Sequence, residues 1–388
     1  MLGAAAPMSS ESPKMSSPSV SSPKLSPEKP SVETFVCLAD FEAIAPDHMS
    51  SMAHGYVTGG AADEVTLRAN CEDWRRLKLN PRALVDVSEI SLKTALFGHT
   101  FESPILLAPT AFHRLCHPEG ERATVAGASQ SATGMVLSSL STVSVEEIAG
   151  ASKYPVWFQL YVQKDRGLTQ QMLERAQAAG CKAVCVTVDT PILGARHRES
   201  RSQFQLPSDF QLPNLNLGSV SHRPVRSAIY SELLNPALVW KDIEWLSSIS
   251  RIPILLKGVI SPEDAGRAQG VGAAGIIVSN HGGRNLDTVP STAEALPRVI
   301  EKLNGKLPVL VDGGIRRGTD VLKALALGAK AVLVGRPYLY ALAYAGSEGV
   351  SRVIEILRTE LMMAMALTGR TAIAQIDRSV LWEATSRG

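Results

Sequence analysis

An excess of one charge, paired cysteines and long apolar runs are all missing from this 388-residue sequence. Its 39 Lys and Arg residues are balanced by 37 Asp and Glu residues, which leaves a formal net charge of +2. Chains that bind nucleic acid or acidic membranes usually carry a clear basic surplus. The longest apolar stretches, such as Ala274–Val278, are strand-sized and far below the roughly 18 residues that cross a bilayer. We therefore expect a soluble protein that binds neither nucleic acid nor membrane.

The cysteines do not suggest a metal site or a disulfide framework. They form an odd set with no Cys-x-x-Cys pair and no histidine-rich partner segment. Cys181 and Cys185 lie four residues apart on one strand-like stretch, where they are too far apart to bond. We expect reduced, mostly buried thiols at Cys37, Cys71, Cys116, Cys181 and Cys185, and no metal.

The N-terminal segment has the composition of a disordered tail. From Met8 to Pro30, 14 of 23 residues are Ser or Pro, and almost nothing apolar is available to bury. The first arginine is Arg68, which disfavours a transit peptide, and the C-terminal Ser-Arg-Gly is not a peroxisomal address. We expect a tail over residues 1–34, a folded unit over residues 35–388 and a cytoplasmic location.

Short runs rich in Val, Ile and Leu recur after the tail, with amphipathic stretches between them. Strands that are buried on both faces of a parallel sheet have this composition. Four of the runs follow a proline and three follow a glycine that is suited to ending a helix. Eight strand–helix units in a row predict an α/β fold, a (β/α)8 barrel. The runs are Ile105–Ala108, Gly134–Ser138, Val156–Tyr161, Ala183–Asp189, Ile254–Lys257, Gly275–Ser279, Val309–Asp312 and Ala331–Gly335.

Two segments fall outside this repeat. About 70 residues separate the starts of the fourth and fifth runs, far more than between other neighbours. The excess, residues 194–240, is polar and rich in Pro, Asn and Ser, so we expect a long loop over the active-site face after the fourth strand. Residues 35–100 precede the first strand, and we expect them to form a helical cap on the barrel.

Polar residues gather where the predicted strands end. Catalytic groups of such barrels lie on this C-terminal face, in the loops that follow the strands. The seventh and eighth runs end in glycines that expose backbone N–H groups and in arginines, a combination that predicts a phosphate site. The strand-end residues are Gln159, Tyr161, Thr187, Asp189, Lys257, Ser279, Asn280, His281, Arg284, Asp312, Gly313, Gly314, Arg316, Gly335 and Arg336.

A base and a cation share this predicted mouth. His281 with Asp189 from another strand end is suited to general-base chemistry, since the carboxylate orients the ring and stabilises its protonated form. Arg284 offers a two-pronged fork for a substrate carboxylate. A structural histidine and a surface ion pair are the alternative interpretations.

Lys257 ends an otherwise apolar strand, so its ammonium group needs an anionic partner or must lose its proton. It is suited to three roles: a Schiff-base lysine, a cation beside a cofactor ring, or one half of a buried ion pair. The predicted phosphate site favours the cofactor role.

Three segments give the sequence a family resemblance that runs from about Phe41 to Ile376. They are Ser279–Arg284, Leu310–Gly318 and Leu160–Val162. In these motifs the chain resembles the FMN-dependent α-hydroxy-acid oxidases, the family of glycolate oxidase. The resemblance makes residues 35–388 an FMN-binding barrel domain.

The resemblance also implies roles for individual residues. His281 would take the substrate hydroxyl or α-proton with support from Asp189. The substrate carboxylate and hydroxyl would be gathered by Arg284, Arg196, Tyr56 and Tyr161. FMN would be held by the backbone of Ala111 and by Ser138, Gln159, Thr187, Lys257 and Ser279, with its phosphate at Asp312, Gly313, Gly314, Arg316, Gly335 and Arg336.

One departure bears on the substrate. Many glycolate-type members carry an aromatic residue two positions after Ser138, whereas this sequence has Leu140. We expect Leu140 to contact the substrate and to reshape the pocket toward a bulkier side chain, long aliphatic or aryl.

The resulting hypothesis is oxidation of an L-2-hydroxy acid to the 2-oxo acid, with reduction of O2 to H2O2, by a homotetramer or larger assembly. The alternative within the family is a lactate- or mandelate-type dehydrogenase with a non-oxygen acceptor. Two alternatives from other classes are an aldolase-type or isomerase barrel that uses Lys257 as a Schiff base, and a barrel that binds ligands without catalysis.

Overall fold

The structure, a computed structural model, describes residues 3, 30–215 and 234–382. Most of the predicted tail and residues 216–233 of the predicted loop lie outside these ranges. Within the predicted tail, Val32–Thr34 form a short 3-10 helix, η1, whose cap is the hydroxyl of Ser31. Helical structure therefore begins slightly before the predicted boundary at residue 35.

Eight strands form a closed barrel in which every neighbouring pair is parallel, with β10 closing onto β3. Each strand lies within one of the eight predicted runs, so the (β/α)8 prediction is confirmed. The strands are β3 (Ile105–Leu107), β4 (Met135–Ser138), β5 (Val156–Leu160), β6 (Val184–Thr187), β7 (Ile254–Lys257), β8 (Gly275–Val278), β9 (Val309–Val311) and β10 (Ala331–Val334).

Prolines begin alternate strands without weakening the barrel. Pro104, Pro155, Pro253 and Pro308 stand directly before β3, β5, β7 and β9. Each carbonyl accepts a hydrogen bond from a neighbouring strand, as from Val184 N to Pro253 O at 2.8 Å. A proline lacks only the N–H, and at the first position of a strand this loss is tolerated.

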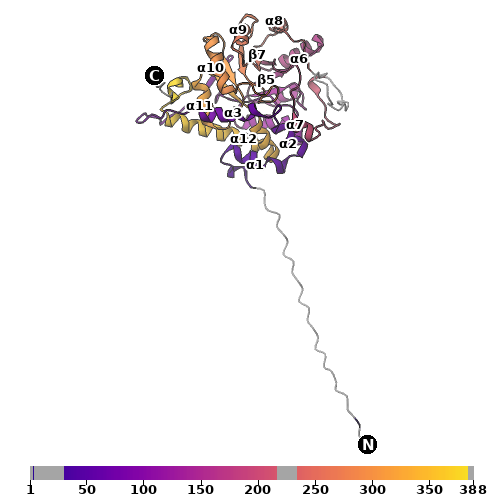
Figure 1. Cartoon of the computed structure of the whole chain (residues 1–388), viewed down its shortest axis with the longest axis horizontal. Helices are drawn as coiled ribbons and strands as arrows, with labels where there is room; N and C mark the ends of the chain where they lie inside the picture. The colour runs from indigo at the N-terminus through magenta and orange to yellow at the C-terminus, as the bar shows by residue number, and fades with distance from the viewer. Residues whose placement is uncertain (1–2, 4–29, 216–233, 383–388) are drawn as a thin grey trace.

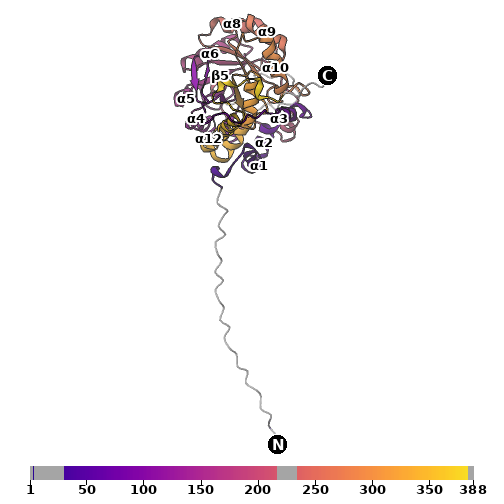
Figure 2. The same cartoon turned by 90° about the vertical axis from the view of Figure 1, so that its left-hand side faces the viewer.

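Each barrel strand is followed by a helix on the outside (Figures 1 and 2). Ser144 and Ser261 cap α5 and α9 by accepting hydrogen bonds from the backbone N–H groups three residues later. The helices are α4 (Glu121–Gln130), α5 (Val145–Ala151), α6 (Arg166–Ala178), α8 (Trp240–Ile249), α9 (Pro262–Gly270), α10 (Thr292–Leu303), α11 (Gly318–Ala326) and α12 (Arg336–Leu367).

The segment before the barrel covers both of its ends. The hairpin of β1 (Thr94–Leu96) and β2 (His99–Phe101) closes the N-terminal end, where Phe97 and Phe101 pack edge-on against Trp157 with ring centroids 5.5 and 6.1 Å apart. Helices α2 (Ser51–Thr58) and α3 (Val65–Arg76) reach the C-terminal mouth. Helix α1 (Leu38–His48) packs against α12, on the side opposite α8 and α9 (Figure 1).

Three of the five cysteines are core residues, and Cys37 and Cys71 are half-buried. All five are unpaired, and Cys116, Cys181 and Cys185 are buried. Burial raises the pKa of each of these three thiols to about 12, which keeps them protonated.

Across the described ranges, no helix combines the length and apolarity needed to span a membrane. The same residues contain no group of three or more His, Cys, Asp or Glu side chains placed to hold a metal ion.

Candidate active site

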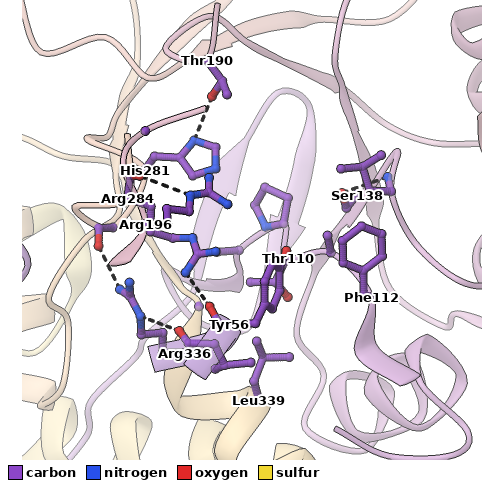
Figure 3. Close-up of a pocket in the computed structure, with 18 of the residues that line it drawn as sticks. Tyr56, Thr110, Phe112, Ser138, Thr190, Arg196, His281, Arg284, Arg336 and Leu339 are labelled. Atoms are coloured by element: carbon purple, nitrogen blue, oxygen red, sulfur yellow. Dashed lines mark hydrogen bonds between the residues drawn. The ribbon is translucent and has the colours of Figure 1, made fainter. Parts of the chain in front are cut away.

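A cavity of about 1120 Å³ opens at the C-terminal ends of the barrel strands (Figure 3). Two predicted site residues, Asp189 and Ser279, do not line it and lie behind residues that do. The predicted residues that line the cavity are Tyr56, Ala111, Ser138, Leu140, Gln159, Tyr161, Thr187, Arg196, Lys257, His281, Arg284, Asp312, Gly313, Gly314, Arg316, Gly335 and Arg336.

His281 is held from behind by a carboxylate. Its Nδ1 lies 3.0 Å from Asp189 Oδ1 and 3.3 Å from the hydroxyl of Thr190, while its backbone N–H donates to Ser279 Oγ at 3.1 Å. The residue has a φ of +56°, a left-handed conformation that costs energy for a side chain with a Cβ. Gly258 permits this arrangement, because a Cβ there would lie 2.4 Å from Asp189 Cγ.

The protonation states follow from burial and charge. Burial lowers the pKa of His281 below its ordinary 6.5, although Asp189 acts in the opposite direction. Burial alone would raise the pKa of Asp189, but His281, Lys257 and the Thr190 hydroxyl outweigh it and lower that pKa. At neutral pH the site thus holds a neutral imidazole whose ring is oriented by an ionised carboxylate, the state that a general base requires.

Lys257 forms a buried ion pair at the cavity wall. Its Nζ lies 3.1 Å from Asp312 Oδ2 and donates to Ser279 Oγ at 3.0 Å. Burial would lower the pKa of Lys257, but Asp312 and Asp189 together raise it. A Schiff-base lysine needs a neutral amine, so this environment disfavours the aldolase-type alternative.

Three strand ends are joined by one hydrogen-bonded row. Gln159 on β5 donates to Thr187 Oγ1 on β6 at 2.9 Å and accepts from Ser138 Oγ on β4 at 3.1 Å. The amide is thereby fixed in orientation, and the row presents polar atoms to the cavity from three adjacent strands.

The backbone after β9 forms a glycine cradle. Gly313 and Gly314 have φ values of +92° and +80°, and a Cβ on Gly314 would lie 1.9 Å from Asn70 O on α3. Trp74 Nε1 donates to Gly313 O at 2.9 Å and anchors the turn. Positive φ and the close approach of α3 therefore require glycine at this turn, and both glycines line the cavity.

The arginines of the predicted phosphate site differ from one another. Arg336 donates to three carbonyls, those of Val57, Gly59 and Gly282, at 2.9 to 3.0 Å, so its guanidinium is not the free fork that the sequence suggested (Figure 3). Gly335 and Arg336 instead begin α12, and the backbone N–H groups at this helix N-terminus can bind a phosphate. Arg316 has fewer partners. Its Nη1 donates to Ile315 O at 3.1 Å, and its Nε lies 3.9 Å from Glu42 Oε2.

The two arginines predicted to bind the substrate carboxylate, Arg284 and Arg196, already make hydrogen bonds within the protein. Arg284 Nη1 donates to Tyr56 O at 2.6 Å and Gly59 O at 2.9 Å, and its Nη2 donates to Glu199 Oε1 at 2.7 Å. Arg196 Nη1 contacts the same Glu199 oxygen at 3.3 Å. Glu199 comes from α7 (His197–Arg201), inside the long insertion after β6.

Aromatic and apolar side chains complete the wall. Tyr56 stacks on Phe204 with ring centroids 4.5 Å apart, and the Arg284 guanidinium lies 4.9 Å above the Tyr56 ring. Burial and the charge of Asp189 raise the pKa of Tyr161 to about 12, so its hydroxyl stays protonated. Leu140 lines the cavity, as predicted.

Sequence reasoning missed several residues of this wall, among them Thr190, Glu199 and Phe204. The spacing of Arg196 and Glu199, three positions apart, was a usable signal because residues at this spacing face each other on a helix. Phe204 carried no local signal, since only the fold of the insertion brings it to Tyr56.

The residues present fit a flavin mononucleotide. The amide and hydroxyl row can bond a ring system with several polar edges, and the glycine cradle, Arg316 and the start of α12 can bond a phosphate. Asp312 Oδ1 is buried without a hydrogen-bond partner among the described residues, and Asp312 lines the cavity directly before the glycine cradle. Lys257 adds a fixed positive charge beside the row.

A closed (β/α)8 barrel with a polar cavity at its mouth, a base, a buried cation and a phosphate cradle defines a cofactor-dependent barrel enzyme. Comparison with known proteins makes the class specific. The model of the FMN-dependent dehydrogenase family matches residues 45–383, so the chain belongs to that family and its cofactor is FMN.

Named relatives cover almost the whole chain. The sequence is 50% identical to L-lactate oxidase of Nostoc sp., over 90% of this chain and 99% of that protein. It is 47% identical to glycolate oxidase 1 of Zea mays, over 87% and 93% of the two chains. The fold matches the crystal structure of mandelate oxidase with (S)-2-phenylpropionate with a TM-score of 0.82 at 38% identity, over 90% and 98% of the two chains.

Proposed function

We propose that this protein oxidises an L-2-hydroxy acid to the 2-oxo acid and reduces O2 to H2O2, with FMN as its cofactor. One observation carries the proposal. A neutral His281, oriented by ionised Asp189, shares a cavity with two arginines that can hold a carboxylate and with the residues that fit a flavin.

FMN would be held by the row of Ser138, Gln159 and Thr187, by Lys257, by the glycine cradle and by the N-terminus of α12. When bound, FMN supplies the two-electron acceptor for the substrate and passes these electrons to O2. The positive charge of Lys257, sustained by Asp312, would stabilise negative charge on a reduced ring.

The chain's own residues would bind and deprotonate the substrate. Arg196 and Arg284 would bind its carboxylate, and the hydroxyls of Tyr56 and Tyr161 would hydrogen-bond its polar groups. His281 Nδ1 faces Asp189, so Nε2 is the nitrogen that would accept the substrate proton. The Asp189 carboxylate would then stabilise the imidazolium.

An apolar wall supports a substrate with an apolar side chain. Phe112, Leu140, Leu193 and Leu206 all line the cavity. We propose a long aliphatic or aryl 2-hydroxy acid, because Leu140 leaves more space than an aromatic residue at that position. Relatives with high identity are named oxidases, so the dehydrogenase alternative is not favoured.

Assembly and location are also proposals. A homotetramer or larger homo-oligomer rests on the family resemblance, and a cytoplasmic location remains the expectation from the sequence. Two relatives of Oryza sativa, 46% identical, are named peroxisomal (S)-2-hydroxy-acid oxidases.

The test is a spectrum followed by a substrate panel. Purified protein should show the visible absorption of oxidised flavin, which bleaches under anaerobic conditions when an accepted L-2-hydroxy acid is added and returns with air. An oxygen electrode with a peroxide assay should show equal O2 consumption and H2O2 production. Bleaching without reoxidation by O2 would favour the dehydrogenase, and a colourless protein would refute both functions.

A further inference from the structure

Glu199 is a charged residue in the cavity to which the proposed reaction assigns no role. Its side chain is 15% exposed, lines the cavity, and places Oε1 2.7 Å from Arg284 Nη2 and 3.3 Å from Arg196 Nη1. A single carboxylate oxygen therefore bridges the two guanidinium groups, here called the arginine clamp, that are proposed to bind the substrate carboxylate.

The bridge reduces what the arginine clamp can offer. A guanidinium has five N–H donors. Arg284 uses three of these on Tyr56 O, Gly59 O and Glu199. Arg196 also makes three such bonds, to Arg284 O, Glu199 and Asn285. Each arginine thus keeps two of its five donors for a ligand, and Glu199 takes up one donor of each arginine together with part of their positive charge.

The charge count shows how many carboxylates the site can neutralise. The two guanidinium groups and Glu199 sum to a formal charge of +1. Arg336, which donates to Gly59 O as Arg284 does, adds one positive charge, and Asp189 behind His281 adds one negative charge. One substrate carboxylate therefore neutralises these groups, and a second carboxylate would make the site negative. Like charges a few ångströms apart repel strongly when they are largely buried, as these side chains are.

We propose that Glu199 is a specificity-determining residue, which limits the arginine clamp to 2-hydroxy acids with one carboxylate and disfavours those with two. The inference rests on the proposed function, because it takes the arginine clamp as the carboxylate site. Glu199 acts by neutralising part of the positive charge of the arginine clamp and does not contact the reacting atoms.

The experiment compares two probes of nearly equal shape and different charge, oxamate with one negative charge and oxalate with two. Binding to the flavin-loaded enzyme is measured by titration calorimetry at pH 8, where His281 is neutral. Glu199→Gln keeps an acceptor oxygen for the arginines but removes the charge. It should raise the preference for oxalate over oxamate by roughly tenfold relative to the unmodified enzyme.

A matched control is the ion pair between Arg198, next to Glu199 on α7, and Glu64 at the start of α3. Arg198 Nη2 and Glu64 Oε2 form an ion pair at 2.7 Å, equal in length to that of Glu199 and Arg284, and the Glu64 side chain is 14% exposed but does not line the cavity. Glu64→Gln should leave the preference between the two probes unchanged. Glu199→Asp, which retains the charge, should also keep it within about twofold of the unmodified enzyme.

The possible outcomes distinguish a wrong role for Glu199 from a wrong proposed function. If the unmodified enzyme binds both probes and Glu199→Gln leaves their ratio unchanged, this inference is wrong and the proposed function stands. Loss of both probes in Glu199→Gln with the flavin spectrum intact would identify Glu199 as a structural support and also overturn it. If the unmodified enzyme binds neither probe, the arginine clamp is not a carboxylate site, and the proposed function falls as well.

Discussion

The two ends of the barrel are built from the same strands but differ in chemistry. At the N-terminal end the inward side chains are apolar: Leu106, Val136, Trp157, Cys185, Leu255, Ile277 and Leu310 are all buried in one cluster with the hairpin. Two residues further along six of these seven strands, the side chains are Ser138, Gln159, Thr187, Lys257, Ser279 and Asp312, whereas the strand of Leu106 continues with apolar Ala108. A shift of about 7 Å along those six strands separates core from active site.

This difference shows how the barrel divides its tasks. Side chains two apart on a strand point to the same face, so one register serves both ends. The closed end is packed by aromatic rings and gives stability, while the open end holds buried charges that cost energy and give function. Substitutions at the open end should therefore reduce activity at little cost in stability, and substitutions at the closed end should do the opposite.

The largest effect is expected at the open end. His281→Ala removes the proposed base, so kcat/KM should fall by more than the roughly 10²–10⁴-fold typical of a lost general base, because substrate orientation is lost too. The flavin should stay bound, as judged by visible absorption of the purified variant. Activity equal to that of the unmodified enzyme would remove His281 from the mechanism.

The closed end is tested by Trp157→Ala. The indole is fully buried between Phe97 and Phe101, so its loss should lower the free energy of unfolding by about 3–5 kcal/mol. Turnover per mole of folded, flavin-loaded protein should change little. Trp382, which is 64% exposed, provides the control, and Trp382→Ala should shift stability by less than about 0.5 kcal/mol. If Trp157→Ala clearly lowered turnover and left the free energy of unfolding nearly unchanged, the division of tasks between the two ends would be wrong.

Arg284→Lys should act between these extremes. A lysine ammonium cannot satisfy the carbonyls of Tyr56 and Gly59 and also reach a substrate carboxylate in a fork. We expect KM for the 2-hydroxy acid to rise by about 10- to 100-fold with flavin retention nearly unchanged. Arg198→Lys, at an exposed ion pair outside the cavity, should alter KM by less than twofold. Equal losses of substrate and flavin binding in Arg284→Lys would exclude its proposed role.

The pH dependence tests the electrostatics of the open end. Burial keeps the pKa of His281 below 6.5, so kcat/KM should be constant near neutrality and fall at acid pH, as the base becomes protonated below 6.5. Asp189 favours the protonated ring, so Asp189→Asn should move this limb to lower pH besides reducing the rate. If the acid limb of the kcat/KM profile stays in place or moves to higher pH in Asp189→Asn, the limb belongs to a group other than His281.

The smallest effect is expected from removing residues 1–29. The truncation leaves Pro30, whose carbonyl accepts a hydrogen bond from the hydroxyl of Tyr344 on α12. The composition of this Ser/Pro-rich segment offers few apolar side chains that could be buried, so we expect melting temperature and kcat to remain unchanged. A cooperative transition at clearly lower temperature would show that the segment contributes to the folded unit.

Much of the fold was legible in the sequence because strand burial leaves a local pattern. The eight apolar runs matched the eight strands, and prolines before alternate runs marked strand starts whose carbonyls are bonded to neighbouring strands. The strand-end residues were also predictable, since a barrel brings the ends of all its strands together. The hairpin that closes the N-terminal end was not distinguished from the rest of the predicted cap, because Phe97 and Phe101 read as ordinary apolar residues.

What the sequence by itself determined is the set of groups at the mouth, because each follows its strand by a fixed number of residues. Only the tertiary structure decided how those groups are engaged. It assigned the guanidinium of Arg336 to three carbonyls and placed Glu199, from the insertion after β6, against Arg284. Such partners lie up to 279 residues apart in the chain, and no local pattern encodes a contact that depends on how distant segments pack.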